Sequence, residues 1–202
     1  MTSVIWDMGG TLVDTYPDVA RALAAAVHAE VDDDALMEVA RLTRVSSSRA
    51  ISTLAGRYDV PEKTLRSAYN ALKERWERQA PPLMDGVLEV MDAVRAAGGV
   101  NLVATHRDRD SATVLVESLG LEIDDMVCAP DGFPRKPDPA MHRALLERND
   151  LTAQDCLAVG DRPADVEAAE AAGIRAYLLT TPGIPLGAPG MRRIESLSEL
   201  PV

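Results

Sequence analysis

Near the N-terminus the chain reads Val4-Ile5-Trp6-Asp7-Met8-Gly9-Gly10-Thr11-Leu12-Val13-Asp14. The apolar run before Asp7 predicts a short buried strand, so the carboxylate stands at a strand end, where it is held rigidly. The two glycines that follow, Gly9 and Gly10, allow backbone N–H groups to turn toward an anion. A strand that simply ends in a tight turn explains the same letters, so a function needs support from elsewhere in the chain.

Three later segments carry polar side chains beside strand-like runs or prolines. They are Val100-Asn101-Leu102-Val103-Ala104-Thr105, Phe133-Pro134-Arg135-Lys136-Pro137-Asp138-Pro139, and Cys156-Leu157-Ala158-Val159-Gly160-Asp161-Arg162-Pro163-Ala164-Asp165. The first ends in a hydroxyl, the second holds a lysine between prolines, and the third carries two acids four residues apart. Each residue alone has an ordinary explanation as a helix cap or a solvated loop residue, but together they need a common one.

From residue 86 onward the apolar spacing alternates between helix and strand. The spacing predicts helices over 86–97, 111–119, 140–147 and 164–172, and strands over 100–104, 126–128, 157–160 and 176–179. Strands that are apolar throughout and alternate with helices indicate an α/β fold with a parallel sheet covered on both faces. Ligands bind such sheets outside the carboxyl ends of the strands, where the polar segments above fall.

Between residues 15 and 82 the strand signals disappear. Helical runs cover 17–30, 33–44, 46–56 and 61–79, with start signals at 32–34 and 46–48 and at Pro61. This segment is too long for a loop. We therefore expect a core domain made of residues 1–14 and 83–202, and an inserted all-helical domain at 15–82. The tail from Thr181 to Val202 is rich in proline and glycine and carries no readable chemistry.

The formal net charge of −11 disfavours nucleic acid as a partner, because phosphate backbones require clustered lysine and arginine. Cations nevertheless gather in the loops after the predicted strands: Arg107, Arg109, Arg135, Lys136 and Arg162. They could hold a small anion there, although loops are also where charges commonly lie.

No charged-then-apolar leader and no long apolar run are evident, so we expect neither secretion nor a membrane partner. Cys128 and Cys156 lie in apolar runs without metal spacing and are expected to be buried thiols. A cytoplasmic enzyme is the natural expectation. His28 and His142 lie on helices without partner spacing and are expected at the surface or half-buried.

The order Asp7, Thr105, Lys136 and Gly160-Asp161 with Asp165 resembles the four motifs of the haloacid dehalogenase-like hydrolase superfamily. The resemblance extends from Val4 to about Leu179. It implies a Rossmann-like parallel sheet core with an inserted all-helical cap domain that covers the site.

By this resemblance Asp7 is the nucleophile, which forms a covalent aspartyl intermediate, and also a metal ligand. Asp161 and the backbone carbonyl of Gly9 complete the ligand set, and Mg²⁺ suits these hard oxygen donors. Thr105 and Lys136 hold the phosphoryl oxygens, and Asp165 orients Lys136 or a metal-bound water.

Three further residues are weaker candidates for substrate binding. Gly10 offers a backbone N–H, Arg107 lies directly after the second motif, and Arg49 lies at a cap turn. The resemblance implies that such a turn can face the active site, whereas a solvated turn is the competing interpretation.

The chain departs from the family pattern at Gly9. Phosphatases that this chain resembles carry a second aspartate there, which protonates the leaving group and then activates water, and general acid–base catalysis of that kind contributes about 10²–10⁴-fold. Glycine keeps the metal-binding carbonyl but cannot donate a proton. Another acid could replace it, with His106 nearest in sequence, or the substrates could be acyl or aryl phosphates, whose leaving groups need little protonation. The chain could also be a binding protein that has lost turnover.

The expected function is a Mg²⁺-dependent phosphatase that acts on a small phosphorylated metabolite through an Asp7 aspartyl-phosphate. The alternative is a catalytically weak protein that binds phosphorylated metabolites. The sequence indicates neither the substrate nor the oligomeric state.

Overall fold

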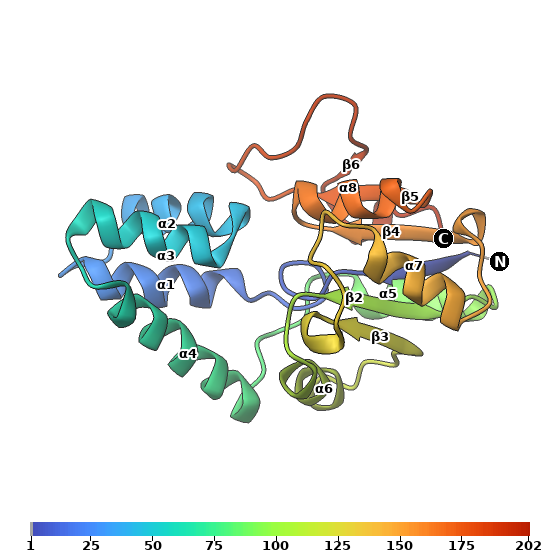
Figure 1. Cartoon of the computed structure of the whole chain (residues 1–202), viewed down its shortest axis with the longest axis horizontal. Coiled ribbons are helices and arrows are strands. Elements are labelled where there is room, and N and C mark those ends of the chain that lie inside the picture. The colour runs from blue at the N-terminus through green and yellow to red at the C-terminus, as the bar shows by residue number, and fades with distance from the viewer. Residues whose placement is uncertain (1) are drawn as a thin grey trace. The chain divides into compact units, whose positions relative to one another are not determined.

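The computed structural model describes residues 2–202, and its contacts divide the chain into two compact units. One unit combines the residues up to Val13 with Pro82–Val202, and the other is Asp14–Pro81. Figure 1 shows the first as a sheet with helices around it and the second as helices α1 to α4.

The core unit is built on a parallel sheet, which confirms the predicted fold class. Within the described residues the strands follow the order β3-β2-β1-β4-β5-β6, and every neighbouring pair is parallel. The strands are β1 (Ser3–Trp6), β2 (Asn101–Thr105), β3 (Asp125–Cys128), β4 (Cys156–Gly160), β5 (Arg175–Leu179) and β6 (Arg193–Ile194). Their central members are buried on both faces, which is why their sequences are apolar without alternation.

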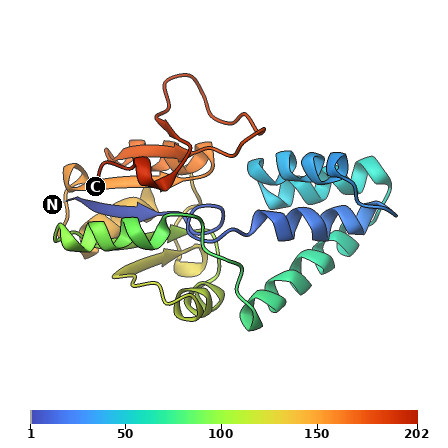
Figure 2. The same cartoon turned by 180° about the vertical axis from the view of Figure 1, so that it is seen from behind.

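Helices cover both faces of this sheet. The core helices are α5 (Val87–Ala96), α6 (Arg109–Ser118), α7 (Ala140–Arg148) and α8 (Pro163–Ala171), with single 3₁₀ turns η1 (Ala129–Asp131), η2 (Ala153–Asp155) and η3 (Leu197–Glu199). Helices α7 and α8 contact each other on one face, and α5 lies on the opposite face, as the two opposite views show (Figures 1 and 2). The core between α7, α8 and the strands contains Ile5, Leu102, Met141, Leu145 and Leu178, among others.

A polar residue of β2 lies inside this largely apolar sheet. Asn101 is fully buried, and its side-chain oxygen accepts a hydrogen bond from Trp6 Nε1 (3.1 Å). Its amide nitrogen donates to the carbonyl of Met91 (3.2 Å), so the side chain ties β2 both to β1 and to α5. A buried amide satisfied in this way fixes the register of the neighbours that it joins.

The second unit is all-helical, as the sequence predicts. Its helices are α1 (Tyr16–Val27), α2 (Asp33–Val45), α3 (Ser47–Tyr58) and α4 (Glu62–Arg78). The side chain of Asp32 caps α2 and that of Ser46 caps α3, which confirms both predicted starts. Between α1 and α4, Asp18 accepts hydrogen bonds from Trp76 Nε1 (2.9 Å) and Arg75 (2.7 Å).

One local expectation was wrong. Helix α3 does not end at Gly56 but continues to Tyr58, because a glycine inside a helix weakens it without breaking it. The tail was given no element from the sequence, and in the structure Arg193–Ile194 forms β6 by pairing with β5, Leu178 opposite Arg193. Among residues 2–202, no helix combines the length and apolar character that a membrane crossing requires.

Candidate active site

Asp7 lies at the carboxyl edge of the sheet. Trp6 is in register with Val103 of β2 and Val159 of β4, and the Asp7 N–H continues the ladder by donating to the carbonyl of Val159 (2.9 Å). The central strand therefore places this carboxylate where β2 and β4 also end. The parallel order brings the motif residues to one edge, as the sequence predicts.

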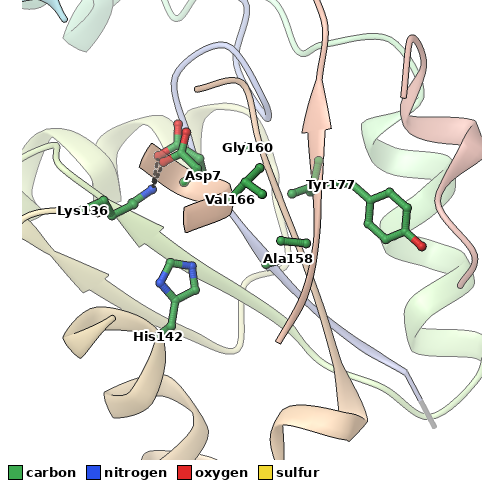
Figure 3. A pocket seen from close by; sticks show the side chains of 10 residues that line it. Asp7, Lys136, His142, Ala158, Gly160, Val166 and Tyr177 are labelled. Carbon is green, nitrogen blue, oxygen red and sulfur yellow. Dashed lines mark hydrogen bonds and ion pairs between the residues drawn. The ribbon is translucent and has the colours of Figure 1, made fainter. Parts of the chain in front are cut away.

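Lys136 reaches this edge from the loop between η1 and α7. Its Nζ donates to Asp7 Oδ1 (2.6 Å) and to Asp165 Oδ1 (2.6 Å), and its side chain is only 2% exposed (Figure 3). Burial alone would lower the pKa of Lys136, but the charges of Asp165 and Asp7 raise it above its usual value. The ammonium group is thus held as a cation between two carboxylates.

Asp165 uses both of its oxygens. Oδ1 accepts from Lys136, and Oδ2 accepts from the backbone N–H of Arg162 (3.0 Å) at the start of α8. Burial would raise the pKa of Asp165, but the Lys136 charge and hydrogen bond keep it below the usual value. This carboxylate joins the first turn of α8 to the lysine, which supports its predicted role in orienting Lys136.

The close approach of Asp165 to β4 depends on Gly160. A Cβ atom built at position 160 would lie 2.3 Å from Asp165 Cβ and 2.6 Å from its Cγ. No side chain larger than hydrogen fits there while Asp165 keeps its place. We call the ion pairs of Lys136 with Asp7 and Asp165 the lysine clamp. This clamp requires glycine at the end of β4.

Asp7, Asp161 and Asp165 form a carboxylate cluster. Each offers one oxygen, and these atoms lie within 4.8 Å of one another. Burial raises the pKa of Asp7 to about 6, with Asp165 and Asp161 adding to the effect and Lys136 opposing it. The donors are hard oxygens crowded with negative charge, which fits a divalent cation such as Mg²⁺. Because both Asp165 oxygens are engaged, Asp7 and Asp161 are the side chains best placed to hold it.

Thr105, at the end of β2, is almost fully buried. Its Oγ1 accepts a hydrogen bond from the backbone N–H of Arg107 (3.2 Å), which leaves the hydroxyl proton to be donated elsewhere. The Arg107 guanidinium donates to Ser111 Oγ (2.9 Å) on α6. Thr105 therefore lies at the edge where Asp7 lies, with its hydroxyl oriented by the following turn.

The remaining substrate-binding candidates differ in outcome. Gly10 has a φ of 89°, as its glycine identity allows, but its N–H donates to the carbonyl of Val13 (2.8 Å). In this structure the Gly10 N–H is therefore engaged within its own turn, and its substrate role stays a prediction. Gly9 lies in the same turn and pairs with Val13 as an isolated bridge. Arg49 belongs to the helical unit, where its N–H donates to Ser46 Oγ (3.0 Å), and its substrate role stays a prediction.

Two histidines lie near Lys136. His106 Nε2 accepts a hydrogen bond from the backbone N–H of Lys136 (2.8 Å). His142 lines the same small pocket as Lys136 and Asp7 (Figure 3), and it is 2% exposed, so the expectation of a surface or half-buried position was wrong. Burial, together with the Lys136 charge, lowers the pKa of His142 to about 3. The one sequence signal for its burial was the spacing of three residues to Leu145 on the apolar side of α7.

A carboxylate cluster with a clamped lysine at the carboxyl edge of a parallel sheet defines an α/β enzyme whose site suits an anion beside a cation. The sequence model of the haloacid dehalogenase-like hydrolases matches residues 4–179, and the chain belongs to that family. This confirms the resemblance drawn from the four motifs and the identification of the chain as a hydrolytic enzyme.

Relatives and solved structures agree with this assignment. The chain is 35% identical over 195 residues to a phosphoglycolate phosphatase of Rhodospirillum rubrum, covering 88% of this chain and 79% of the relative. It is 28% identical to a hydrolase structure from Streptococcus pneumoniae, with a TM-score of 0.68 and coverage of 89% of this chain and 93% of that one. A hydrolase of the same family from Deinococcus radiodurans, solved with bound phosphate and sodium, shares the fold at 22% identity and a TM-score of 0.75, covering 95% and 89% of the two chains.

Proposed function

We propose that this protein is a Mg²⁺-dependent phosphomonoester hydrolase that acts on a small phosphorylated metabolite in the cytoplasm. The observation that carries the proposal is the meeting of Asp7, Asp161 and Lys136 at one edge of the sheet, with carboxylate oxygens within 4.8 Å and the lysine bound to Asp7. Phosphoryl transfer depends mainly on positioning and on neutralising charge, and this cluster offers both. The two free, buried thiols, Cys128 and Cys156, suit a reducing compartment.

The reaction begins with a carboxylate oxygen of Asp7 attacking phosphorus, while the bond from phosphorus to the leaving oxygen breaks and that oxygen takes a proton from solvent water. This step requires ionised Asp7, which Lys136 favours through its hydrogen bond. The Lys136 ammonium and the Thr105 hydroxyl hold phosphoryl oxygens. Water then attacks phosphorus in the aspartyl-phosphate, which releases phosphate and restores the Asp7 carboxylate.

A divalent cation held by Asp7, Asp161 and the Gly9 carbonyl would supply charge neutralisation for the phosphoryl group. Asp165 keeps Lys136 in place rather than acting on substrate, because its two oxygens are already engaged.

Hydrolysis of para-nitrophenyl phosphate with Mg²⁺ tests the proposal, with Asp7→Asn as the inactive control. The related phosphoglycolate phosphatases make 2-phosphoglycolate the first metabolite to assay. Turnover that disappears in Asp7→Asn supports a phosphatase with an Asp7 nucleophile. Equal rates in both proteins would refute the proposed mechanism.

The alternative function rests on Gly9, which leaves the nucleophile loop without a proton-donating side chain at that position. A catalytically weak protein that binds phosphorylated metabolites would be as inert as Asp7→Asn. It would still be stabilised against thermal unfolding by phosphate or 2-phosphoglycolate, because a ligand that binds only the folded state raises Tm.

A further inference from the structure

The imidazole of His106 connects two catalytic motifs that lie far apart in sequence. It directly follows Thr105 at the end of β2, and its Nε2 accepts the backbone N–H of Lys136 at 2.8 Å, across 30 residues. The side chain of that lysine carries the charge clamped by Asp7 and Asp165 at 2.6 Å each. His106 therefore binds the main chain of the residue whose ammonium group would meet the substrate.

This hydrogen bond determines the protonation state of the ring. A nitrogen that accepts a hydrogen bond carries no proton, so the neutral imidazole has its proton on Nδ1. The tautomer follows from the Lys136 N–H, which can only donate. Burial and the neighbouring charges of Lys136 and Arg135 also favour the neutral ring, since they lower the pKa of His106 to about 4. Nε2 thus has no proton to give at neutral pH.

Lys136 needs an anchor of this kind. It lies in the loop between η1 and α7, and a lysine side chain is a flexible four-carbon stem with a point charge at its end. When phosphate arrives, the contacts of the ammonium group with Asp7 and Asp165 must be shared with the phosphoryl oxygens. The bond from His106 to the main chain does not depend on those contacts and holds the base of the side chain in place.

We propose that His106 is a positioning residue, which aims Lys136 at the phosphoryl group by accepting its backbone N–H, and that it does not protonate the leaving group. The inference rests on the proposed phosphatase function. It assigns His106 a different role from the substitute acid that its place in the sequence suggested.

His106→Gln and His106→Ala separate the two roles. The glutamine amide oxygen can reach about where Nε2 lies and can accept the same N–H, but it does not titrate near neutral pH. We expect His106→Ala to lower kcat/KM for para-nitrophenyl phosphate by about 10²-fold, because a misplaced catalytic group costs that much, while His106→Gln stays within about fivefold of wild type. The kcat–pH profiles of all three proteins should have the same shape. A glutamine variant as impaired as the alanine variant, with one limb of the wild-type profile missing, would overturn the inference.

A double-mutant cycle with Lys136→Met tests whether His106 acts through the lysine. In the Lys136→Met background we expect His106→Ala to have little further effect, because the group that it positions is gone. A full, independent loss in the double variant would contradict the inference. His28→Gln, in the helical unit, is the matched control for replacing a histidine and should keep wild-type kinetics, and urea unfolding establishes that each variant is folded.

Failure of the proposed phosphatase function can be distinguished from failure of the proposed role of His106. If wild type hydrolyses nothing, the phosphatase proposal fails, and the rise in Tm caused by inorganic phosphate replaces the rate as the measurement. A rise that persists in His106→Gln and is lost in His106→Ala supports positioning of Lys136. Equal rises in all three proteins would refute it.

Discussion

Gly160 offers the sharpest test of how the lysine clamp is built. It lies at the end of β4, its φ is not positive, and alanine is therefore allowed there by the backbone. The obstacle is space, because the new Cβ would lie 2.3 Å from Asp165 Cβ and 2.7 Å from its Oδ2. An ordinary carbon–carbon contact is about 3.5 Å, so Asp165 must move by about 1.2 Å. Asp165 Cβ is fixed to α8, so either that helix or β4 has to shift.

The expected cost has two parts. Overpacking of this kind destabilises a core by about 1–3 kcal/mol. A movement of about 1 Å also breaks the contact of Asp165 with Lys136, and loosening one partner of a buried ion pair costs up to about 3–5 kcal/mol. We expect Gly160→Ala to lower the free energy of unfolding by about 3 kcal/mol or more and to lower kcat/KM by about 10²-fold.

Urea unfolding and para-nitrophenyl phosphate hydrolysis, measured on the same preparations, check both numbers. Gly99→Ala is the matched control, because its Cβ would lie 2.2 Å from the carbonyl oxygen of Thr2, at the opposite end of β1 from Asp7. It should lose stability but keep its activity per folded molecule. Gly56→Ala has nothing within 4 Å and lies in an exposed part of α3, so it should gain about 0.5–1 kcal/mol. A Gly160→Ala protein as stable and as active as wild type would refute the reasoning about the clamp.

Three further predictions concern leaving-group protonation, metal binding and the pH dependence of stability. Gly9→Asp should raise kcat/KM for 2-phosphoglycolate by up to about 10²-fold, because its alkyl leaving group needs a proton. The gain for para-nitrophenyl phosphate should be far smaller, and equal gains for both substrates would show that leaving-group protonation is not the limiting step. Asp161→Asn should raise the Mg²⁺ concentration for half-maximal rate by at least about tenfold in a Mg²⁺ titration, and an unchanged value would exclude Asp161 as a ligand. Burial lowers the pKa of His142 to about 3 in the folded protein, whereas in the unfolded chain the imidazole binds a proton below about pH 6.5. Between these two pH values acidification therefore favours the unfolded chain, and the free energy of unfolding falls by up to about 1.4 kcal/mol per pH unit. His142→Gln should flatten that fall in urea unfolding from pH 7.5 to about 4 with EDTA, and an identical slope would show that the histidine is not buried as a neutral base.

The fold could be predicted from the sequence because its signals are local. A strand buried on both faces is mostly apolar, and β1, β2 and β4 each carry an apolar run with a polar residue at or directly after the strand end. Strand β6 has no such signature, since it is two residues long, begins with Arg193 and exists only through its pairing with β5. Its formation depends on a tertiary neighbour that no local pattern reveals.

The sequence also predicts which residues meet at the carboxyl edge of the sheet. Thr105 ends a strand and Asp7 and Asp161 directly follow strands, so the parallel order alone brings them to one edge. The contacts that join them were not predictable, because each links positions far apart: His106 to the main chain of Lys136, and Lys136 to Asp7 across 129 residues. The burial of His142 and the engagement of the Gly10 N–H with Val13 also depend on packing and loop geometry rather than on residue type.

The net charge of the carboxylate cluster and Lys136 explains why the proposed site needs a divalent cation. With three ionised carboxylates and one ammonium group, the cluster has a net charge of −2. This negative charge would repel a phosphate dianion. The same imbalance acts on Asp7, whose pKa burial and the neighbouring acids raise to about 6 despite Lys136. A divalent cation held by Asp7 and Asp161 would balance this charge and would also favour the ionised form of Asp7. Lys136 alone would not balance the charge, because it also donates to Asp165. In the proposed phosphatase the lysine would orient the anion, and a divalent cation would neutralise the site enough to admit it.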